Sequence, residues 1–449
     1  MSRDAKALSL WDTLRFQLHV SVPAFLLGVV VPNRWFLSRL ACWNAARLAH
    51  RFVRKLRVKY RSNLLWLWFP TRRTLLVLAP ATIDAVLASG DNAPDPALKK
   101  RAISRFAPGA LVMSGDAAQG RRRAFNTSAL DLGRLHRDAE TFARIAAGEV
   151  RRMLDARTDA LRWSDFESLG KRVSHQIILG AGSIDDMLAA DLARMLRRAN
   201  LLLRDETSFH GFRMRVGASL RRHEGAPPAP CLLDIAARAL TDGSASPSTC
   251  VTSQVAFWFF VLKDAVELHV PRTLALIAAH PDVQAKVRSE IRDAGELAAP
   301  AIDRLRYLEA CVTEQLRLWT PVPMLLRRAV RRCLVGGETV EAGQQFLIHA
   351  GFYHRDRRVF GRVAHAFAPG DAAAGALPPV YVFSAHGRSC AGRSLVTFVL
   401  KSALATMLAR CRFELVRPAI EPGRIPYLYD HFDVELRPVP DALTSARDA

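Results

Sequence analysis

Apolar positions recur three and four residues apart along most of the chain, which is the spacing of amphipathic or buried α-helices. Leu395 to Leu408 is one such apolar, helix-like run. Other helical segments are expected at about residues 134–156, 163–181, 183–204, 208–222, 231–240 and 250–279. The pattern therefore predicts a mainly α-helical protein.

Two shorter stretches have the pattern of β-hairpins. Asn63 to Leu78, broken by Pro70-Thr71-Arg72, is expected to form a hairpin ahead of a helix from Thr82 to Ser89. Gly336 to Ile348 is expected to form a second short hairpin. The predicted fold class is thus mainly α with a small β region.

Length and composition favour one large globular unit. The chain has 449 residues, of which 50% are hydrophobic, and no repeat, low-complexity tract or Gly/Ser linker divides it. Its seven cysteines are odd in number and lack paired C-x-x-C spacing, which argues against a disulfide framework or a zinc site. They indicate a reducing compartment, so we expect a cytoplasmic protein.

The net charge of +22, from 64 Lys and Arg against 42 Asp and Glu, raises the question of nucleic acid binding. No recognised nucleic-acid motif accompanies the charge, so the charge describes the surface field rather than a specific ligand. We expect no nucleic acid partner.

Residues 1–60 are expected to form a basic and apolar segment ahead of the main domain. The apolar stretch from Val20 to Val31 contains Pro23 and is shorter than the roughly 20 residues that span a bilayer as a helix. The basic residues that follow alternate with apolar ones: Arg51, Arg54, Lys55, Arg57, Lys59 and Arg61. This pattern suits peripheral contact with an anionic membrane surface, such as the inner face of the membrane. It equally suits a helix packed on the domain with its basic edge in water.

Cys390 stands at a junction between a loop and the run that starts at Leu395, and Arg388 and Arg393 flank it. A thiolate in such a position can be held ionised as a metal ligand. The alternative is that Cys390 is a small, partly buried hydrophobic residue, as most free cysteines are.

Glu314 and Arg317 lie three residues apart on a segment with helical periodicity, so both side chains share one face. Alone, this E-x-x-R spacing describes an ordinary surface salt bridge. The downstream pattern F-x-x-x-x-R-x-C-x-G runs from Phe383 to Gly392. Together the two patterns resemble the haem-thiolate enzymes of the cytochrome P450 superfamily. The resemblance extends from about residue 55 to 440, through His280-Pro281, Leu318 to Arg327 and Phe367-Ala368-Pro369.

The resemblance implies a single-domain cytochrome P450-like fold over residues 61–449, with a bound haem b. It implies that Cys390 is the axial ligand of the haem iron. It also implies that Glu314 and Arg317 hold the fold together behind the cysteine loop.

Further cofactor contacts are implied in the same way. Phe383 and Gly392 would belong to the cofactor-binding loop. Guanidinium groups suit the planar carboxylates of the haem propionates, and the candidates are Arg122, Arg327 and Arg388. Ala118 and Gln119 stand where the family commonly has an aromatic and a basic residue that help to anchor a propionate.

The resemblance places Asp264 and Ala265 in the oxygen-activating segment. Asp264 retains the family's acid, whereas Ala265 replaces the hydroxyl that usually organises the water for proton delivery. Val261 and Leu262 would narrow the distal space. Proton delivery would then rely on Asp264, water or a substrate hydroxyl, because a general acid must lie within hydrogen-bond reach. The alternative for Asp264 is a solvated carboxylate on a helix face.

Two further departures from the family pattern concern the cysteine loop and the salt bridge. His386 stands where a glycine usually precedes the cysteine by four residues, so an altered turn is expected. Asp371 stands where the family usually supplies an arginine to Glu314 and Arg317, so that group is expected to be incomplete.

The resemblance implies a monooxygenase that oxidises an apolar substrate, lipid-like or from secondary metabolism, with dioxygen and externally supplied electrons. The alternatives are a peroxygenase, isomerase or dehydratase that needs no reductase, and a non-catalytic haem-binding protein of the same fold. A basic face around the cysteine would attract an acidic ferredoxin or flavodoxin-type donor with its NAD(P)H reductase. The residues of that face would be Arg121, Arg122, Arg123, Arg388, Arg393 and Lys401. A generally solvated basic surface is the alternative.

Overall fold

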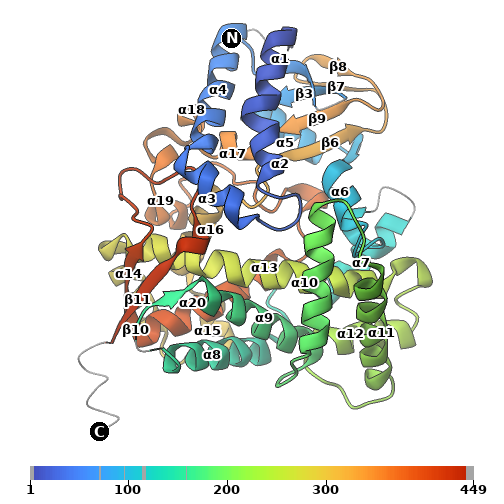
Figure 1. Cartoon of the computed structure of the whole chain (residues 1–449), viewed down its shortest axis with the longest axis vertical. Coiled ribbons are helices and arrows are strands. Elements are labelled where there is room, and N and C mark those ends of the chain that lie inside the picture. Colours follow the sequence, from blue (N-terminus) through green and yellow to red (C-terminus); the bar gives the residue numbers. More distant parts are fainter. Residues whose placement is uncertain (1–4, 70–71, 96, 114–117, 158, 441–449) are drawn as a thin grey trace.

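The computed structural model of the chain describes residues 5–69, 72–95, 97–113, 118–157 and 159–440. Figure 1 shows a body of helices at one end of the molecule and a β-sheet with the N-terminal helices at the other. Between these two parts runs α13 (Val251–Ala278), a helix of 28 residues.

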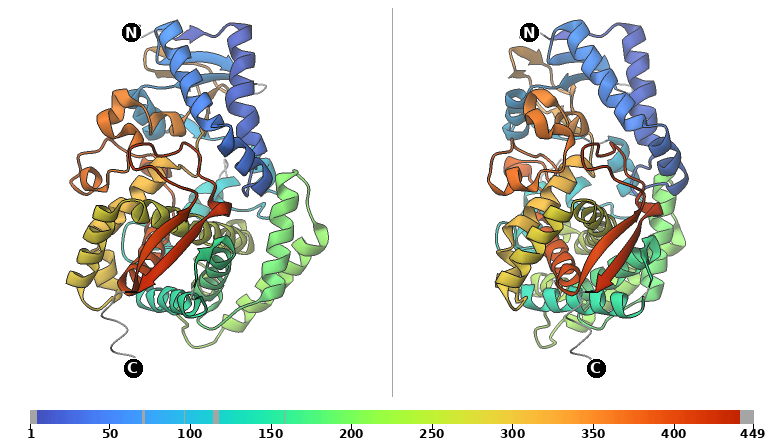
Figure 2. Two further views of the ribbon diagram at one scale, coloured as in Figure 1. Left: turned by 60° about the vertical axis from the view of Figure 1, so that its left-hand side comes forward. Right: turned by 90° about the vertical axis from the view of Figure 1, so that its left-hand side faces the viewer.

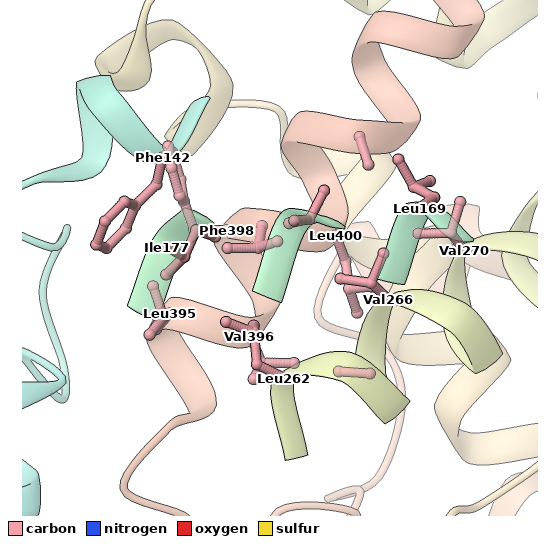
Figure 3. Packing of buried hydrophobic residues seen from close by; sticks show 14 of the residues in the cluster. Phe142, Leu169, Ile177, Leu262, Val266, Val270, Leu395, Val396, Phe398 and Leu400 are labelled. Atoms are coloured by element: carbon pink, nitrogen blue, oxygen red, sulfur yellow. The ribbon is translucent and has the colours of Figure 1, made fainter. Parts of the chain in front are cut away.

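The helical body is built around α13, whose residues are buried on nearly every side. Helices α9 (Trp163–Leu179) and α20 (Arg393–Arg410) pack on it, and α8 (Ala139–Asp155) packs against both of them. A helix that is apolar all round has to be covered by other elements. In the resulting core, Val266 of α13 lies in one cluster with Leu169 of α9 and Leu400 of α20 (Figure 3).

The helices predicted from the sequence pattern are confirmed, with shifts of a few residues at most of their ends. Besides those above they are α5 (Pro80–Ala88), α10 (Asp186–Asn200), α11 (Glu206–His223), α12 (Leu232–Thr241) and α14 (Pro281–Ala294). The other α-helices beyond residue 60 are α6 (Ala97–Ile103), α7 (Ala118–Ala129), α15 (Ala299–Asp303), α16 (Arg306–Leu318), α17 (Ala350–Tyr353), α18 (Arg357–Phe360) and α19 (Pro369–Ala373).

The main sheet has six strands in the order β1-β2-β3-β9-β6-β4. They are β1 (Lys6–Ala7), β2 (Leu64–Trp68), β3 (Arg73–Val77), β4 (Asn92–Pro94), β6 (Leu325–Ala329) and β9 (Gln345–Ile348). The hairpin predicted between Asn63 and Leu78 is confirmed, since β2 and β3 are antiparallel with Leu65 opposite Leu76. Residues 70 and 71 of its turn lie outside the described residues.

The second predicted hairpin, Gly336 to Ile348, is wrong in its pairing. β8 (Glu338–Val340) pairs with β7 (Cys333–Val335) across a turn at Gly336 and Gly337, which both have positive φ. β9 lies instead between β3 and β6. Every residue of β9 is buried, which suits a central strand covered on both faces. The small remaining sheet contains β5 (Leu161–Arg162), β10 (Cys411–Arg417) and β11 (Glu435–Pro440).

The N-terminal residues pack onto the main sheet, as the two views of Figure 2 show. Their helical elements are α1 (Leu10–Phe16), η1 (Gln17–Ser21), α2 (Val22–Leu26), α3 (Arg34–Cys42) and α4 (Ala45–Tyr60). β1 pairs in parallel with β2, and Phe16 and Val53 share a buried cluster with strand residues such as Leu65. No helix in the described ranges is long and apolar enough to cross a membrane.

Arg57 does not lie on the basic surface where the sequence pattern put it. Its side chain is buried, and its Nη2 donates to Oδ1 of Asp356 at 3.1 Å. The physical reason is helical geometry, because Arg57 follows Val53 and Leu56 on the side of α4 that faces the core. The neighbouring Arg51, Arg54, Lys55 and Lys59 are exposed.

Candidate active site

One large cavity lies where α13, the cysteine loop and the N-terminal helices meet, and its volume is about 1800 Å³. Its wall includes Cys390 from the loop, Asp264 and Ala265 from α13, and apolar side chains such as Phe260 and Leu268. A pocket for one drug-sized ligand measures roughly 300–1,000 Å³. The cavity therefore has room for a large planar group together with a second molecule.

Cys390 ends a tight loop directly before α20. Its amide donates to the carbonyl of Phe383 at 2.8 Å, which closes the loop around the sulfur. Burial raises the pKa of the Cys390 thiol, while the amide of Gly392 and the charges of Arg123 and Arg393 act in the opposite direction. Phe383 and Gly392 both line the cavity beside Cys390.

His386 takes the left-handed conformation in this loop, with φ of 55°. This is the conformation that glycine adopts without steric cost, which explains why a glycine would suit the position. Gly387 does not take over that role, since positive φ is found at His386 itself. His386 Nε2 lies 2.9 Å from Oδ1 of Asp84 on α5, and this contact supports the turn.

Two arginines on the cavity wall have unsatisfied guanidinium groups. Arg327 donates from Nη2 to Oγ of Ser384 at 2.7 Å, but its buried Nε has no partner, and neither has the buried Nη1 of Arg388. Burial, reinforced by the charge of Arg388, lowers the pKa of Arg327 to about 10. Within the described chain neither guanidinium forms an ion pair with an acid. Two carboxylates of a ligand would supply the missing partners.

The third predicted propionate contact, Arg122, is not on the cavity wall. Its Nε donates to the carbonyl of Ser248 at 3.0 Å. The arginine of α7 that lines the cavity is Arg123, which donates to the carbonyl of Ser389 in the cysteine loop. Adjacent helical residues point about 100° apart, so a shift of one position decides which arginine reaches the cavity.

Glu314 and Arg317 are fully buried in α16 and lie away from the cavity wall. Nε and Nη2 of Arg317 donate to the two carboxylate oxygens of Glu314 at 2.6 Å and 2.8 Å. Carbonyl groups satisfy the rest of the guanidinium, with distances of 2.7 Å to His354 and 2.9 Å to Ala366. The amide of Ala368 donates to Glu314 at 3.0 Å.

The expected departure at Asp371 has a structural counterpart. Asp371 pairs at 3.3 Å with Arg362, whose side chain is exposed. In the described part of the chain no second arginine contacts Glu314. The backbone of residues 354–368 provides the stabilising contacts instead.

Asp264 lines the cavity, and its side chain is partly buried there. Burial, together with the charge of Glu267, raises the pKa of Asp264 well above its usual value. Glu267 forms an ion pair with Lys263, and burial raises the pKa of Glu267 as well. The neutral form of the Asp264 carboxyl is therefore favoured, and in that form it can donate a hydrogen bond.

The expectation that Val261 and Leu262 both narrow the cavity is half wrong. Val261 lines the cavity, but Leu262 is buried in the core cluster that also contains Val396 of α20 (Figure 3). The reason is again the 100° turn between adjacent helical residues. Ala265 lines the cavity and presents no hydroxyl there.

The expectation that Lys401 belongs to the basic face around the cysteine is wrong. Its side chain is buried, and Nζ donates to the carbonyl of Asp303 at 2.7 Å and to Glu309 at 3.1 Å. The ammonium group therefore holds α20 to α15 and α16. Arg121 and Arg393 are exposed, in agreement with the expected face.

The structure thus gathers most of the predicted site residues on one cavity and adds others. Together on its wall are Phe383, Arg388, Cys390, Gly392, Arg327, Asp264 and Ala265. The cations on the same wall that the sequence analysis did not assign to the site include Lys99, Arg272 and Arg355. For Arg272 a signal existed, because a lone arginine on a long apolar helix calls for a partner.

Comparisons with known proteins agree with this geometry. A family model described as Cytochrome P450 matches residues 271–423. Cytochrome P450 4c3 of Drosophila melanogaster is 30% identical over 195 residues, which is 41% of this chain and 36% of that protein. Human cytochrome P450 4V2 is 32% identical over 168 residues, which is 35% of this chain and 32% of that protein.

A likeness at the level of the fold extends much further. The crystal structure of a cytochrome P450, CYP102L1, matches with a TM-score of 0.70 at 17% sequence identity. The match covers 88% of this chain and 94% of that one. By sequence, in contrast, the alignments span about a third of the length of the curated relatives.

The fold is that of a cytochrome P450, and residues 271–423 match the model of that family. This family and fold bind haem b. The cavity wall fits that group, because it carries a cysteine between cationic side chains and two arginines that have buried, unpartnered nitrogens and no acid partners.

Proposed function

We propose that the protein is a haem-thiolate monooxygenase that oxidises an apolar, lipid-like substrate. The observation that carries the proposal is the cavity itself, which brings Cys390, Asp264, and Arg327 and Arg388 without acid partners to one wall. Cys390 would be the axial ligand, and Arg327, Arg388 and Arg123 would hold the propionates. A thiolate-ligated haem supplies dioxygen activation, which the electron-rich sulfur favours.

Asp264 would supply protons at the reacting end of the cavity. In its neutral form the carboxyl can donate a proton, and the Lys263–Glu267 pair next to it can take part in restoring that proton. Ala265 offers no hydroxyl to organise a water molecule. A substrate hydroxyl close to Ala265 would therefore assist proton delivery.

The lining of the cavity supports an apolar substrate. Most of the side chains on its wall are apolar, among them Phe257, Phe260, Val261, Leu268 and Met324. Burying such surface against an apolar chain contributes about 25 cal/mol per Å². The volume beyond that needed for a planar cofactor suits an extended molecule such as a lipid.

The electron donor would bind near the cysteine loop. Arg121 and Arg393 are exposed there, on α7 and at the start of α20. An acidic ferredoxin or flavodoxin, reduced by an NAD(P)H reductase, is the partner whose charge complements this face. Its association should weaken with salt, because exposed charges are screened.

The N-terminal helices would contact a membrane from one side. Large apolar residues form an exposed N-terminal stripe along α1, η1 and α2: Leu10, Trp11, Leu14, Leu18, Val22 and Phe25. Val22 and Phe25 also line the cavity, so a lipid-like substrate leaving the membrane would reach the cavity directly. Exposed basic residues of α4, such as Arg51 and Lys55, add attraction to anionic lipid headgroups.

Cosedimentation with vesicles of phosphatidylglycerol and phosphatidylcholine tests the membrane contact. The double variant Trp11→Ser/Leu18→Ser should bind at least about tenfold more weakly, because each side chain loses roughly 1.5–3 kcal/mol of burial. Met214→Ser on α11, which is 55% exposed at the other end of the molecule, is the matched control. Equal binding by both variants would refute the membrane contact.

Turnover assays test the proposed activity. The purified, haem-loaded protein should oxidise fatty acyl and terpenoid probes with NADPH, a ferredoxin reductase, a ferredoxin and dioxygen. Product formation only with added peroxide, and not with reductase and dioxygen, would instead indicate a peroxygenase. The missing hydroxyl at Ala265 is the observation that favours this second candidate.

A further inference from the structure

The cavity extends along α13 beyond Asp264 to a second group of polar side chains. Arg272 lies two turns after Asp264, and the cavity wall contains Asp264, Leu268 and Arg272 in succession on one helix face. Tyr429, from the segment before β11, and Thr320, from the segment after α16, line the same region. Residues as far apart in the sequence as Arg272 and Tyr429 are thus brought together at one end of the cavity.

These three side chains share an unusual property, since each has a buried polar atom without a hydrogen-bond partner. In the described chain, Nε of Arg272, the hydroxyl of Tyr429 and Oγ1 of Thr320 are all unpartnered. Arg272 is 9% exposed and Tyr429 is 1% exposed. A buried donor left without a partner costs about 1–3 kcal/mol, and a charged group costs more. Such groups are expected to be satisfied by something that occupies the cavity.

The local charge is positive, and no carboxylate of the described residues pairs directly with Arg272, although Asp264 and Asp430 act on it from farther away. Nη2 of Arg272 lies 2.9 Å from Nδ1 of His431, which accepts this hydrogen bond as a neutral ring, because burial and the charge of Arg272 lower the pKa of His431. Within the described residues Arg272 forms no ion pair with an acid. Burial lowers the pKa of Arg272 to about 10, so the guanidinium stays charged at neutral pH.

A second buried guanidinium on the cavity wall belongs to Arg355. Its nitrogens donate to the carbonyls of Leu318, Ile425 and Pro426 at 2.7–3.1 Å. These neutral acceptors satisfy its hydrogen bonds, but within the described residues no acid forms an ion pair with it. The cation of Arg272 and two hydroxyl groups in an apolar cavity complement an oxyanion. A planar carboxylate suits an arginine and two hydroxyl donors particularly well.

The site is held rigid before any ligand binds. The ring of Tyr429 stacks on Trp319, with centroids 4.5 Å apart and an interplanar angle of 14°. The indole Nε1 of Trp319 donates to the carbonyl of Pro426 at 2.8 Å. A ligand therefore gains its hydrogen bonds without having to order these side chains.

We propose that Arg272, Tyr429 and Thr320 bind the carboxylate of an amphipathic acid whose hydrocarbon chain extends along the apolar wall of the cavity. The site would thereby define the substrate class as a long-chain carboxylic acid and fix which part of the chain lies near Ala265. The assignment of this acid as a substrate rests on the proposed function. The binding of the carboxylate does not.

Calorimetric titration of the haem-loaded protein tests the binding directly. Decanoate, methyl decanoate and decyl phosphate are the probes, and the readout is the ratio of the Kd of the ester to the Kd of the acid. A hydrogen bond to a charged group corresponds to roughly a 10- to 100-fold change in affinity. The protein should therefore prefer decanoate over its ester by at least about tenfold.

Substitutions assign this preference to the site. Arg272→Met should reduce the ratio to about one, and Tyr429→Phe should reduce it severalfold while keeping the stack on Trp319. Tyr429→Phe removes one oxygen atom only, so it remains informative if Arg272→Met fails to fold. Arg424→Gln, an exposed arginine of the same segment, is the matched control and should leave the ratio unchanged.

The outcomes separate this proposal from the proposed function. An unchanged ratio in Tyr429→Phe and Arg272→Met would overturn the carboxylate site, as would decyl phosphate binding as tightly as decanoate. The calorimetric ratio does not depend on electron transfer or on product formation. A protein that binds decanoate through Arg272 but oxidises nothing would contradict the proposed function alone.

Discussion

Replacing Arg317 with methionine should destabilise the protein severely, although Arg317 lies away from the cavity. Within the described chain Arg317 donates six hydrogen bonds, two to Glu314 and four to backbone carbonyls of residues 354–366. Methionine keeps much of the side-chain volume but leaves Glu314 buried without its cation. Removing one partner of a buried ion pair typically costs about 3–5 kcal/mol.

This cost can be converted into a shift in melting temperature. The entropy of unfolding is about 2.1 cal/mol/K per residue, which for a chain of 449 residues gives roughly 0.9 kcal/mol per degree. The Arg317→Met variant should therefore melt about 3–5 °C lower than the unsubstituted protein. Haem loading should fall as well, because the same arginine fixes the segment that leads to the cysteine loop.

The assay is thermal unfolding followed by far-ultraviolet circular dichroism, with haem content measured on the same samples. Arg306→Met is the matched control, since Arg306 and Glu309 form an i,i+3 pair on the same helix α16. That pair is 3.4 Å long and the Arg306 side chain is 72% exposed, so its loss should cost less than about 1 kcal/mol. Equal melting temperatures and equal haem content of the two variants would refute the reasoning.

Three further outcomes are expected. His50→Phe should make the protein less sensitive to acid. Burial lowers the pKa of His50 to about 3, below its unfolded value of 6.5, so the parent protein loses stability as the pH falls from 6.5 towards 3. The free energy of unfolding of the variant relative to the parent should therefore rise by up to about 1.4 kcal/mol per pH unit below 6.5. A difference that is independent of pH in melting curves between pH 7 and 5 would contradict this. Ala265→Thr should increase the product formed per NADPH with substrates that lack a hydroxyl, and a lower or unchanged yield would show that another group delivers the proton. His386→Gly should raise the melting temperature slightly. Relief of the left-handed backbone at this residue is worth about 1–2 kcal/mol, which exceeds the free energy lost with the half-exposed contact to Asp84. A lower melting temperature would show that the contact with Asp84 dominates.

The parts of the fold that follow from local pattern were predictable from the sequence. The 28 residues of α13 are apolar enough to predict a central helix, and the alternation in Asn63 to Leu78 predicts the β2–β3 hairpin. The position of β9 was not predictable in this way. Its partners β3 and β6 are chosen by tertiary packing, and β3 lies about 270 residues away along the chain.

The candidate site likewise contains some residues that local sequence spacing identifies and others that only the folded chain brings together. Short spacings within one loop or helix identified Cys390 and the Glu314–Arg317 pair. Which of two adjacent arginines in α7 reaches the cavity depends on helix orientation to within one residue, and the sequence reasoning chose Arg122 where the wall has Arg123. The group of Arg272, Tyr429 and Thr320 has no motif at all, because only the folded chain brings these three segments together.

The absorption spectrum of the reduced, carbon-monoxide-bound protein tests the central claim most directly. If Cys390 is the axial ligand, the protein and a Cys42→Ala variant, which lacks an exposed cysteine, should both show the thiolate-type Soret band. Cys390→Ala should lose that band while its far-ultraviolet circular dichroism shows that it is folded. A folded Cys390→Ala protein that retains the thiolate-type band would contradict the account.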